Sequence, residues 1–295
     1  MGGPAILVRG LRKAYGNLEA VRGVDLEVAR GEVFALLGPN GAGKTTTVEI
    51  LEGHRRRDAG EVSVLGHDPE RREPALRRRV GIVLQSTGIE PYLTVDEVIE
   101  QFRGFYPAPL PREEVLQVVG LTEERGRRVR RLSGGQQRRL DVAVGLAGDP
   151  DLLFLDEPTT GFDPAARRGA WEMVRRLRGL GKTVVLTTHY LDEAQALADR
   201  AAIIVAGRIV AEGRPGELGG ADTRTTISFL PPTGDLPPGA GLEGGRAILR
   251  TDEPTRALHE LTAWALERGA ELGDLRVARA SLEDVYLELT GGAGE

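Results

Sequence analysis

The chain has 295 residues, of which 40% are hydrophobic and 28% charged, which is ordinary globular composition with enough apolar mass for one large and one smaller core. Its formal net charge of −5 argues against a protein whose main task is to bind nucleic acid. Cysteine is absent, so a disulfide framework and a thiolate metal site are excluded. No apolar run approaches the roughly 18 residues of a membrane span, and no signal peptide is visible, so we expect any membrane role to come through a partner.

The N-terminal residues predict two short strands, Ala5–Val8 and Gly23–Val28, around a turn at Tyr15-Gly16-Asn17. Tyr15 has two interpretations that spacing alone does not separate. It is either a half-buried aromatic at a sheet edge, or a flat ring that stacks on an adenine base.

A phosphate-binding motif follows the strand-like run Glu32–Leu37. The pattern G-x-x-x-x-G-K-[ST] is fitted at Gly38, Gly43, Lys44 and Thr45. Glycines let successive backbone N–H groups face one anion, and the helix predicted over Thr45–Leu51 adds its N-terminal N–H groups. Lys44 supplies a cation for the terminal phosphates, and the Thr45 hydroxyl can bind Mg²⁺.

The next segment predicts a strand, a basic helix and a second strand. These are Glu61–Leu65, Pro74–Arg79 and Val80–Leu84, and the last of them ends at Gln85.

Residues 86–131 have a helical pattern and form an insertion between strands. Thr94-x-x-Glu97 is a capping box that predicts a helix start, and a Pro-rich break over Pro107–Pro111 precedes a helix over Glu113–Val119. The basic run Arg125–Arg131 is typical of a solvated face, with contact to an anionic surface as the alternative.

The motif Leu132-Ser133-Gly134-Gly135-Gln136 has two compatible interpretations. Ser133 and Gln136 form a capping box for a helix over Gln137–Ala147. Two glycines at an exposed helix N-terminus also make a second anion site, which is unusual in one chain unless both sites act on nucleotide.

Two carboxylates follow a buried strand over Leu152–Leu155. Asp156 and Glu157 are costly to bury without a partner, and Mg²⁺ beside the phosphate loop would account for both. Asp156 would position the metal, and Glu157 would polarise the attacking water. A loop with Asp163 leads to a helix over Ala165–Leu177.

A further strand, Thr183–Thr187, ends near His189. Four strand-like runs therefore end in polar or phosphate-binding groups: the Gly38 loop, Gln85, Asp156-Glu157 and His189. Ligands of parallel α/β sheets bind beyond the carboxyl ends of the strands, so we expect these groups to form one site.

Residues 5 to about 217 resemble the nucleotide-binding domain of ABC transporters, because Leu132–Gln136 is similar to that family's signature motif. The resemblance implies an α/β P-loop NTPase domain over 1–217, with a mixed β core and a helical signature subdomain at about 86–147. It also implies ATP and Mg²⁺ as cofactors, bound between two copies arranged head to tail.

The resemblance implies a role for each matching position. The catalytic residues would be Glu157, His189, Gln85 and Lys44. The nucleotide-binding residues would be Tyr15, Gly38, Asn40, Gly41, Gly43, Lys44, Thr45, Thr46, Ser133, Gly135, Gln136 and Asp163. The metal ligands would be Thr45, Gln85 and Asp156.

Residues 218–295 predict a small α+β accessory domain. Strands are expected over Thr225–Leu230, Ala247–Arg250 and Leu275–Ala278, with helices over Pro254–Arg268 and Leu282–Leu289. The segment Ala280–Tyr286 resembles the C-terminal extension of drug-exporter ATPases of the daunorubicin-resistance type.

The sequence therefore predicts an ATPase that powers an exporter of a drug or another lipophilic compound. Its expected partners are a separate multi-spanning membrane permease and a second copy of the chain, with no nucleic acid. Its expected location is cytoplasmic, at the inner face of the cell membrane. The alternatives are an ABC-type ATPase that acts on ribosomes or DNA, and a nucleotide-binding regulator without turnover.

Overall fold

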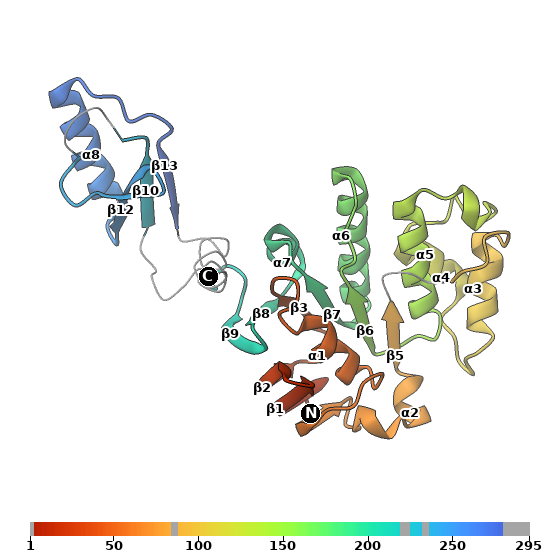
Figure 1. Ribbon diagram of the computed structural model, residues 1–295. Coiled ribbons are helices and arrows are strands. Elements are labelled where there is room, and N and C mark those ends of the chain that lie inside the picture. Colours follow the sequence, from red (N-terminus) through yellow and green to blue (C-terminus); the bar gives the residue numbers. More distant parts are fainter. Residues whose placement is uncertain (1–2, 84–87, 219–224, 232–235, 280–295) are drawn as a thin grey trace. The chain divides into compact units, whose positions relative to one another are not determined.

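The computed structural model describes residues 3–83, 88–218, 225–231 and 236–279, and Figure 1 shows its elements along the chain. The chain divides into two compact units, Met1–Pro215 and Gly216–Glu295. Gln85 and the helix expected over 282–289 lie outside the described residues.

The first unit alternates strands and helices. Its elements are β1 (Ile6–Tyr15), β2 (Leu18–Val28), β3 (Val33–Leu37), α1 (Lys44–Leu51), β4 (Ala59–Val64), η1 (Pro69–Arg71), α2 (Pro74–Arg77), β5 (Val80–Val83), α3 (Val95–Arg103), α4 (Arg112–Val119), η2 (Val129–Arg131), α5 (Gly134–Leu146), β6 (Leu152–Asp156), α6 (Pro164–Gly179), β7 (Thr183–Thr188), α7 (Leu191–Leu197), β8 (Arg200–Val205) and β9 (Arg208–Gly213).

Six strands form the main sheet in the order β5-β6-β7-β3-β8-β9. The first five are parallel, and β9 returns antiparallel to β8. Asp156 at the end of β6 pairs with Thr187, and Leu37 at the end of β3 pairs with Thr188. The prediction that these strands end at one edge of a parallel sheet is confirmed. The sequence patterns did not predict β8, β9 or α7.

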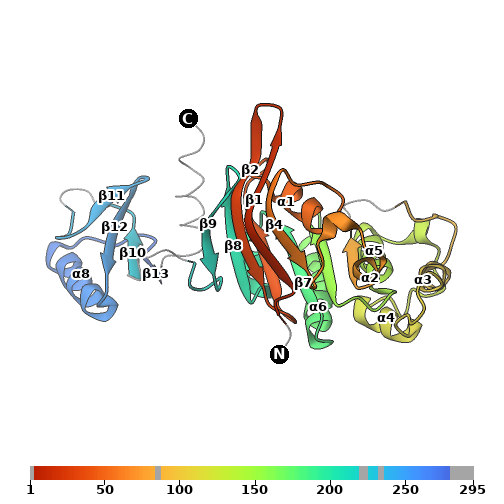
Figure 2. The same ribbon diagram turned by 90° about the horizontal axis from the view of Figure 1, so that it is seen from below.

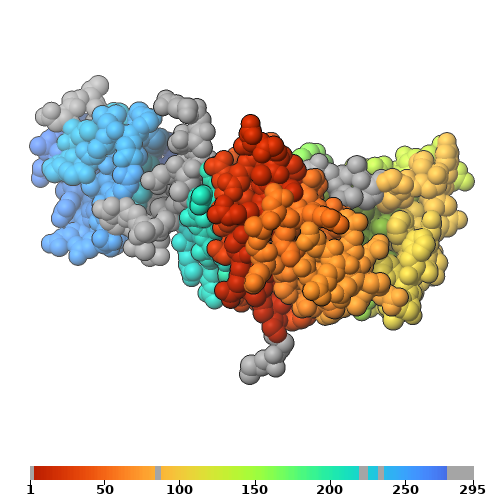
Figure 3. Space-filling model, turned by 60° about the horizontal axis from the view of Figure 1, so that its bottom comes forward, coloured from red at the N-terminus to blue at the C-terminus, as the bar shows by residue number. Residues whose placement is uncertain are grey.

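A three-stranded antiparallel sheet, β2-β1-β4, packs over the main sheet with α1 between them (Figure 2). The β1–β2 hairpin and the segment that follows α1 lie side by side on one face (red and orange in Figure 3). β1 and β2 extend well beyond the expected short strands, over 10 and 11 residues. Register shifts along the pair explain the difference, because a β-bulge interrupts the period of two that marks a strand.

Both faces of the central strands β3, β6, β7 and β8 are buried, which explains their nearly continuous apolar sequences. Alternate side chains such as Phe34, Phe154 and Ile204 join the core shared with the antiparallel sheet. The opposite face is covered by α6 and α7, which contact β7 and β3. The strands β3, β6 and β7 are therefore held by packing on both faces of the sheet almost to their carboxyl ends.

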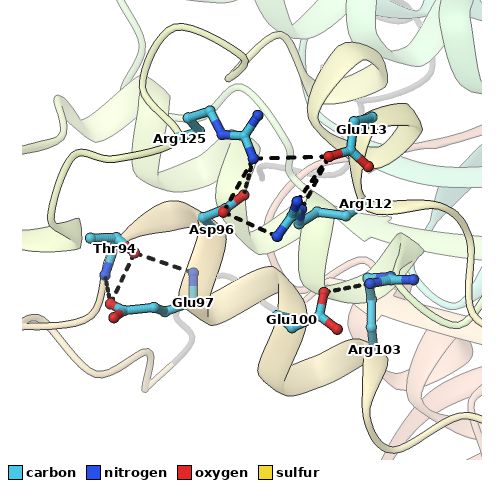
Figure 4. Close-up of polar contacts among 8 residues, drawn as sticks. All are labelled: Thr94, Asp96, Glu97, Glu100, Arg103, Arg112, Glu113 and Arg125. Atoms are coloured by element: carbon cyan, nitrogen blue, oxygen red, sulfur yellow. Dashed lines mark hydrogen bonds and ion pairs between the residues drawn. The ribbon is translucent and has the colours of Figure 1, made fainter.

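The helices α3, α4 and α5 pack against one another in the insertion between β5 and β6. The two predicted capping boxes are confirmed at the starts of α3 and α5. Figure 4 shows that Asp96 lies between Arg112 and Arg125, at 3.2 and 3.3 Å, and joins α3 to α4 and to the loop after it. Arg125 is thus held in an ion-pair network inside the helical part.

In the described residues of the second unit, a four-stranded antiparallel sheet in the order β11-β12-β10-β13 lies with one helix. Its elements are β10 (Thr225–Phe229), β11 (Gly241–Glu243), β12 (Arg246–Thr251), α8 (Pro254–Arg268) and β13 (Arg276–Arg279). The helix predicted over Pro254–Arg268 is confirmed, and it is amphipathic, because Leu261 and Ala265 are buried and Leu258 is partly buried on one face. Within the described residues, no helix combines the length and apolarity that a membrane crossing requires.

Candidate nucleotide site

Two glycines of the phosphate loop are required by packing. A Cβ at Gly38 would lie 2.3 Å from the Ile204 carbonyl oxygen, and one at Gly43 would lie 2.4 Å from that of Ala20. Gly43 also has a φ of +104°, a conformation that side chains other than glycine rarely adopt. The loop is therefore pressed against β8 and β2, while Asn40, Gly41 and Thr45 are exposed at its outer side.

Lys44 begins α1 and is only 6% exposed. Its Nζ donates hydrogen bonds to the carbonyl oxygens of Gly38 at 2.7 Å and Pro39 at 3.1 Å. Burial lowers the pKa of Lys44, and the negative charges of Glu157 and Asp156 oppose that shift. The ammonium group is thus held inside the loop and lies within electrostatic reach of both carboxylates.

Asp156 is oriented by the neighbouring strand. The Thr187 hydroxyl donates a hydrogen bond to Asp156 Oδ1 at 2.5 Å. Carboxylate and hydroxyl oxygens are the hard ligands that Mg²⁺ takes together with substrate phosphates, so Asp156 and Thr45 fit this ion by their chemistry.

Glu157 has a φ of +45°, in the left-handed region that is unfavourable for a residue with a side chain. Its backbone N–H donates to the hydroxyl oxygen of Thr187 at 3.0 Å. Thr160 Oγ1 donates to Glu157 Oε2 at 2.9 Å, and His189 Nδ1 lies 3.3 Å from Oε1. The strained backbone and these contacts fix the direction of the carboxylate at the end of β6.

The signature motif lies in a cleft of about 760 Å³ whose lining also includes Glu157 and Asp163. Ser133 Oγ accepts a hydrogen bond from Gln136 N at 3.2 Å, and Gln136 Oε1 accepts one from Ser133 N at 2.9 Å. The Gln136 amide also donates to Glu124 at 2.8 Å. The capping interpretation is confirmed, and the capping residue Ser133 is exposed in the lining of this cleft.

Tyr15 lies beside the phosphate loop, and Asp163 lines the cleft of the signature motif. Tyr15 is 39% exposed, and its hydroxyl lies 3.5 Å from that of Thr46 in the phosphate loop. Asp163 caps α6, because its Oδ1 accepts hydrogen bonds from Ala165 N and Ala166 N at 2.8 Å.

The structure brings Lys44, Asp156, Glu157 and His189 together at one edge. It does not bring the signature to the phosphate loop, because no described residue of 38–46 lines the cleft of Ser133. The sequence patterns missed Thr187, whose hydroxyl group donates to the Asp156 carboxylate, and Arg138, which donates to the backbone carbonyl oxygen of Asp156. In α5, Arg138 stands three positions before Asp141, which is the spacing of an ion pair along a helix, and this spacing is the signal that would have pointed to Arg138.

Comparison with known proteins identifies the family to which this fold and this group of site residues belong. Residues 21–160 match the family described as "ABC transporter", and residues 225–281 match "ABC transporter domain-containing protein-like, C-terminal domain". Among solved structures, the ADP conformation of the ATP-binding cassette MJ1267 is similar, with a TM-score of 0.63 and 26% identity over 72% of this chain and 91% of that one. The dimeric bacterial cassette MJ0796 has a TM-score of 0.62 and 26% identity over 71% of this chain and 98% of that one.

Full-length relatives are more similar in sequence. The daunorubicin resistance ATP-binding protein DrrA3 of Streptomyces coeruleorubidus is 40% identical over 99% of this chain and 97% of the relative. The Nod factor export ATP-binding protein I of Ralstonia nicotianae is 38% identical over 98% of this chain and 94% of the relative. Because this similarity spans nearly the whole of each protein, the chain belongs to the ABC transporter family, as an ATP-hydrolysing subunit of the exporter type that includes the daunorubicin-resistance ATPases.

Proposed function

We propose that two copies of the chain close head to tail on ATP and that hydrolysis reopens them, so that a separate membrane-spanning partner is driven to export its cargo. The observation that carries this proposal is the separation of two anion-binding helix ends in one chain. Lys44 lies at one of them and Ser133 at the other, in a cleft that none of the described loop residues 38–46 lines. A second copy is needed for both to act on one triphosphate.

The proposed nucleotide contacts follow from exposure and chemistry. Tyr15 stacks on the adenine, and the loop N–H groups and Lys44 hold the phosphates. The residues of one copy are Tyr15, Gly38, Asn40, Gly41, Gly43, Lys44, Thr45 and Thr46. Those that face the nucleotide of the other copy are Ser133, Gly135, Gln136 and Asp163.

In the proposed reaction, Glu157 accepts a proton from the attacking water. Its carboxylate is already directed by Thr160 and His189, so His189 is placed to hold the water and the γ-phosphate in line. Asp156 and Thr45, with Gln85, would hold Mg²⁺, which neutralises charge that develops on the phosphate oxygens. Lys44, whose Nζ donates to the loop carbonyl oxygens, would hold the phosphate oxygens from the side of the loop.

The proposed docking region of the membrane partner is the helical insertion after Gln85. Tyr92 and Phe105 on it are 61% and 72% exposed. A groove of about 440 Å³ lies beside it, lined by Phe102 and Tyr106 from the insertion and by Glu52 and His54 from the end of α1. Exposed aromatic side chains beside a groove are typical of a protein interface.

A drug or another lipophilic compound is the proposed cargo, because two similar relatives are named for daunorubicin resistance. Others are named for Nod factor export, so the cargo is expected to be selected by the membrane partner. We further propose that residues 1–217 are the ATPase domain, that residues 218–295 are an accessory domain, and that the protein acts at the inner face of the cell membrane. Co-purification with a multi-spanning membrane protein supports export, whereas co-sedimentation with ribosomes or DNA would support the alternative.

The test uses Glu157→Gln, which removes the proposed base and keeps the shape of the side chain. We expect turnover to fall at least about 100-fold while ATP binding persists, as for loss of a general base. With Mg-ATP the variant should have the mass of a dimer in light scattering, and adding Lys44→Ala should return it to a monomer.

Absence of cysteine allows the orientation to be tested directly. Asn40→Cys and Gly134→Cys, introduced into separate Glu157→Gln copies and mixed, should cross-link with ATP. A trapped variant that stays monomeric, or a dimer that cross-links only between identical positions, contradicts the head-to-tail arrangement.

A further inference from the structure

The peptide bond between Asp156 and Glu157 joins the two carboxylates of the site. Its orientation decides where the Glu157 side chain points, because Glu157 has a strained backbone with a φ of +45°. A conformation of this kind persists only where the surroundings hold it. The groups that hold this peptide therefore control the position of Glu157.

The N–H side of the peptide is held by β7. Glu157 N donates to the Thr187 carbonyl oxygen at 3.2 Å and to its hydroxyl oxygen at 3.0 Å. The same hydroxyl donates to the Asp156 carboxylate at 2.5 Å. Strand β7 thus fixes one side of the peptide and one carboxylate together.

The C=O side of the peptide is held by a different part of the chain. Arg138 Nη2 donates a hydrogen bond to the Asp156 carbonyl oxygen at 2.6 Å. Arg138 is 8% exposed, and its Nη1 lies 3.7 Å from Asp141 Oδ2 on the same helix. A buried, charge-assisted hydrogen bond is short and directional, so the guanidinium group couples the movement of α5 to that of the carbonyl group.

Helix α5 is the element that begins at the signature motif. Ser133 caps it, and Arg138 follows little more than one turn later, within one cleft whose lining includes Ser133, Arg138 and Glu157. A helix this short moves nearly as a rigid body. Displacement of its N-terminus therefore reaches the guanidinium group, the carbonyl oxygen and then Glu157.

We propose that Arg138 is a positioning residue that aligns Glu157 when the signature motif of the same copy engages the triphosphate held by the other copy. The proposal rests on the proposed function, because it needs a nucleotide at Ser133. It assigns to one side chain the step by which binding at one nucleotide prepares hydrolysis at the other.

A helix-stabilising role for Arg138 is the competing explanation, and Arg139 provides the matched control. Arg139 lies on the same helix, but its Nη1 donates to the Gly120 carbonyl oxygen at 2.8 Å, near the end of α4. Arg138→Met removes the contact with the Asp156 carbonyl and keeps much of the apolar volume. Arg139→Met removes a comparable contact that does not involve the carboxylates.

We expect Arg138→Met to lower kcat about 10- to 100-fold, as for misplacement of a catalytic group by about 1 Å, with KM for ATP changed less than about twofold. Arg139→Met should leave kcat within about twofold, and Arg138→Lys should recover part of the loss. In the Glu157→Gln background, Arg138→Met should lower the residual turnover less than about twofold, because both changes act on one group.

Additive losses in that double variant would overturn the proposal, as would a raised KM with unchanged kcat or an equal loss from Arg139→Met. If Arg138→Met does not fold, Arg138→Lys is carried through the same cycle. Dimer formation is measured in parallel on the Glu157→Gln protein. Absence of the dimer counts against the proposed function, whereas additivity in the cycle counts against Arg138 alone.

Discussion

Glu52 is the C-cap residue of α1 and carries a carboxyl group that is almost fully buried, with a side chain 4% exposed. Burial raises the pKa of Glu52 from an ordinary 4.5 to about 8, and the charges of Asp156 and Glu49 add to the rise. The folded protein therefore holds this proton more tightly than the unfolded chain does. Stability should fall as the pH rises from about 4.5 to about 8.

The size of the pH-dependent loss of stability follows from the shift in the pKa of Glu52. A difference of about 3.5 pKa units corresponds to at most about 5 kcal/mol, at 1.36 kcal/mol per unit. Between about pH 5.5 and pH 8, the part that is lost amounts to about 3 kcal/mol. Glu52→Gln cannot ionise, so this pH-dependent loss is absent from the variant. The free energy of unfolding of Glu52→Gln relative to the parent should rise by about 3 kcal/mol between those two pH values.

The two tryptophans allow the free energy of unfolding to be measured for the first unit alone. Trp171 lies on α6 and Trp264 on α8, so a Trp264→Phe background leaves Trp171 as the reporter. Urea unfolding is followed at both pH values without nucleotide or Mg²⁺. Glu123→Gln, at an exposed position, is the control. A pH-dependent difference below about 1 kcal/mol for Glu52→Gln, or the same difference for Glu123→Gln, refutes the reasoning.

Two further predictions concern the nucleotide site. Gly38→Ala places a methyl group 2.3 Å from the Ile204 carbonyl oxygen, so it should abolish ATP binding and lower the free energy of unfolding by about 1–3 kcal/mol or more. Gly126→Ala, where no described atom lies within 4 Å of the added Cβ, should change stability by less than about 0.5 kcal/mol, and equal effects of the two in calorimetry would contradict this account. Tyr15→Ala should weaken ATP binding by about 1–3 kcal/mol in titration calorimetry, whereas Tyr15→Phe should keep it, and unchanged affinity in Tyr15→Ala would exclude stacking.

Some of the site could be predicted because the chemistry is local in sequence. The loop at Gly38 and the capping boxes at Thr94 and Ser133 are fixed by neighbouring residues, and the structure confirms the caps. The shared edge could be predicted because parallel strands end together. Strand order could not, since β7 lies between β3 and β6 through contacts far apart in the chain.

The sequence patterns did not predict the polar groups at buried positions. These groups lie near the edge of the main sheet that carries the proposed catalytic residues. Glu193 is fully buried, and its carboxyl group faces the hydroxyl groups of Thr188 and Thr159. Arg138 contacts the carbonyl oxygen of Asp156, and Glu52 lies within electrostatic reach of that residue's carboxylate. Burial of such groups costs free energy that apolar side chains of similar size would avoid. Their gathering at the segments that carry Asp156, Glu157 and His189 indicates that this part of the core is adapted to hold catalytic groups in place, at the expense of stability.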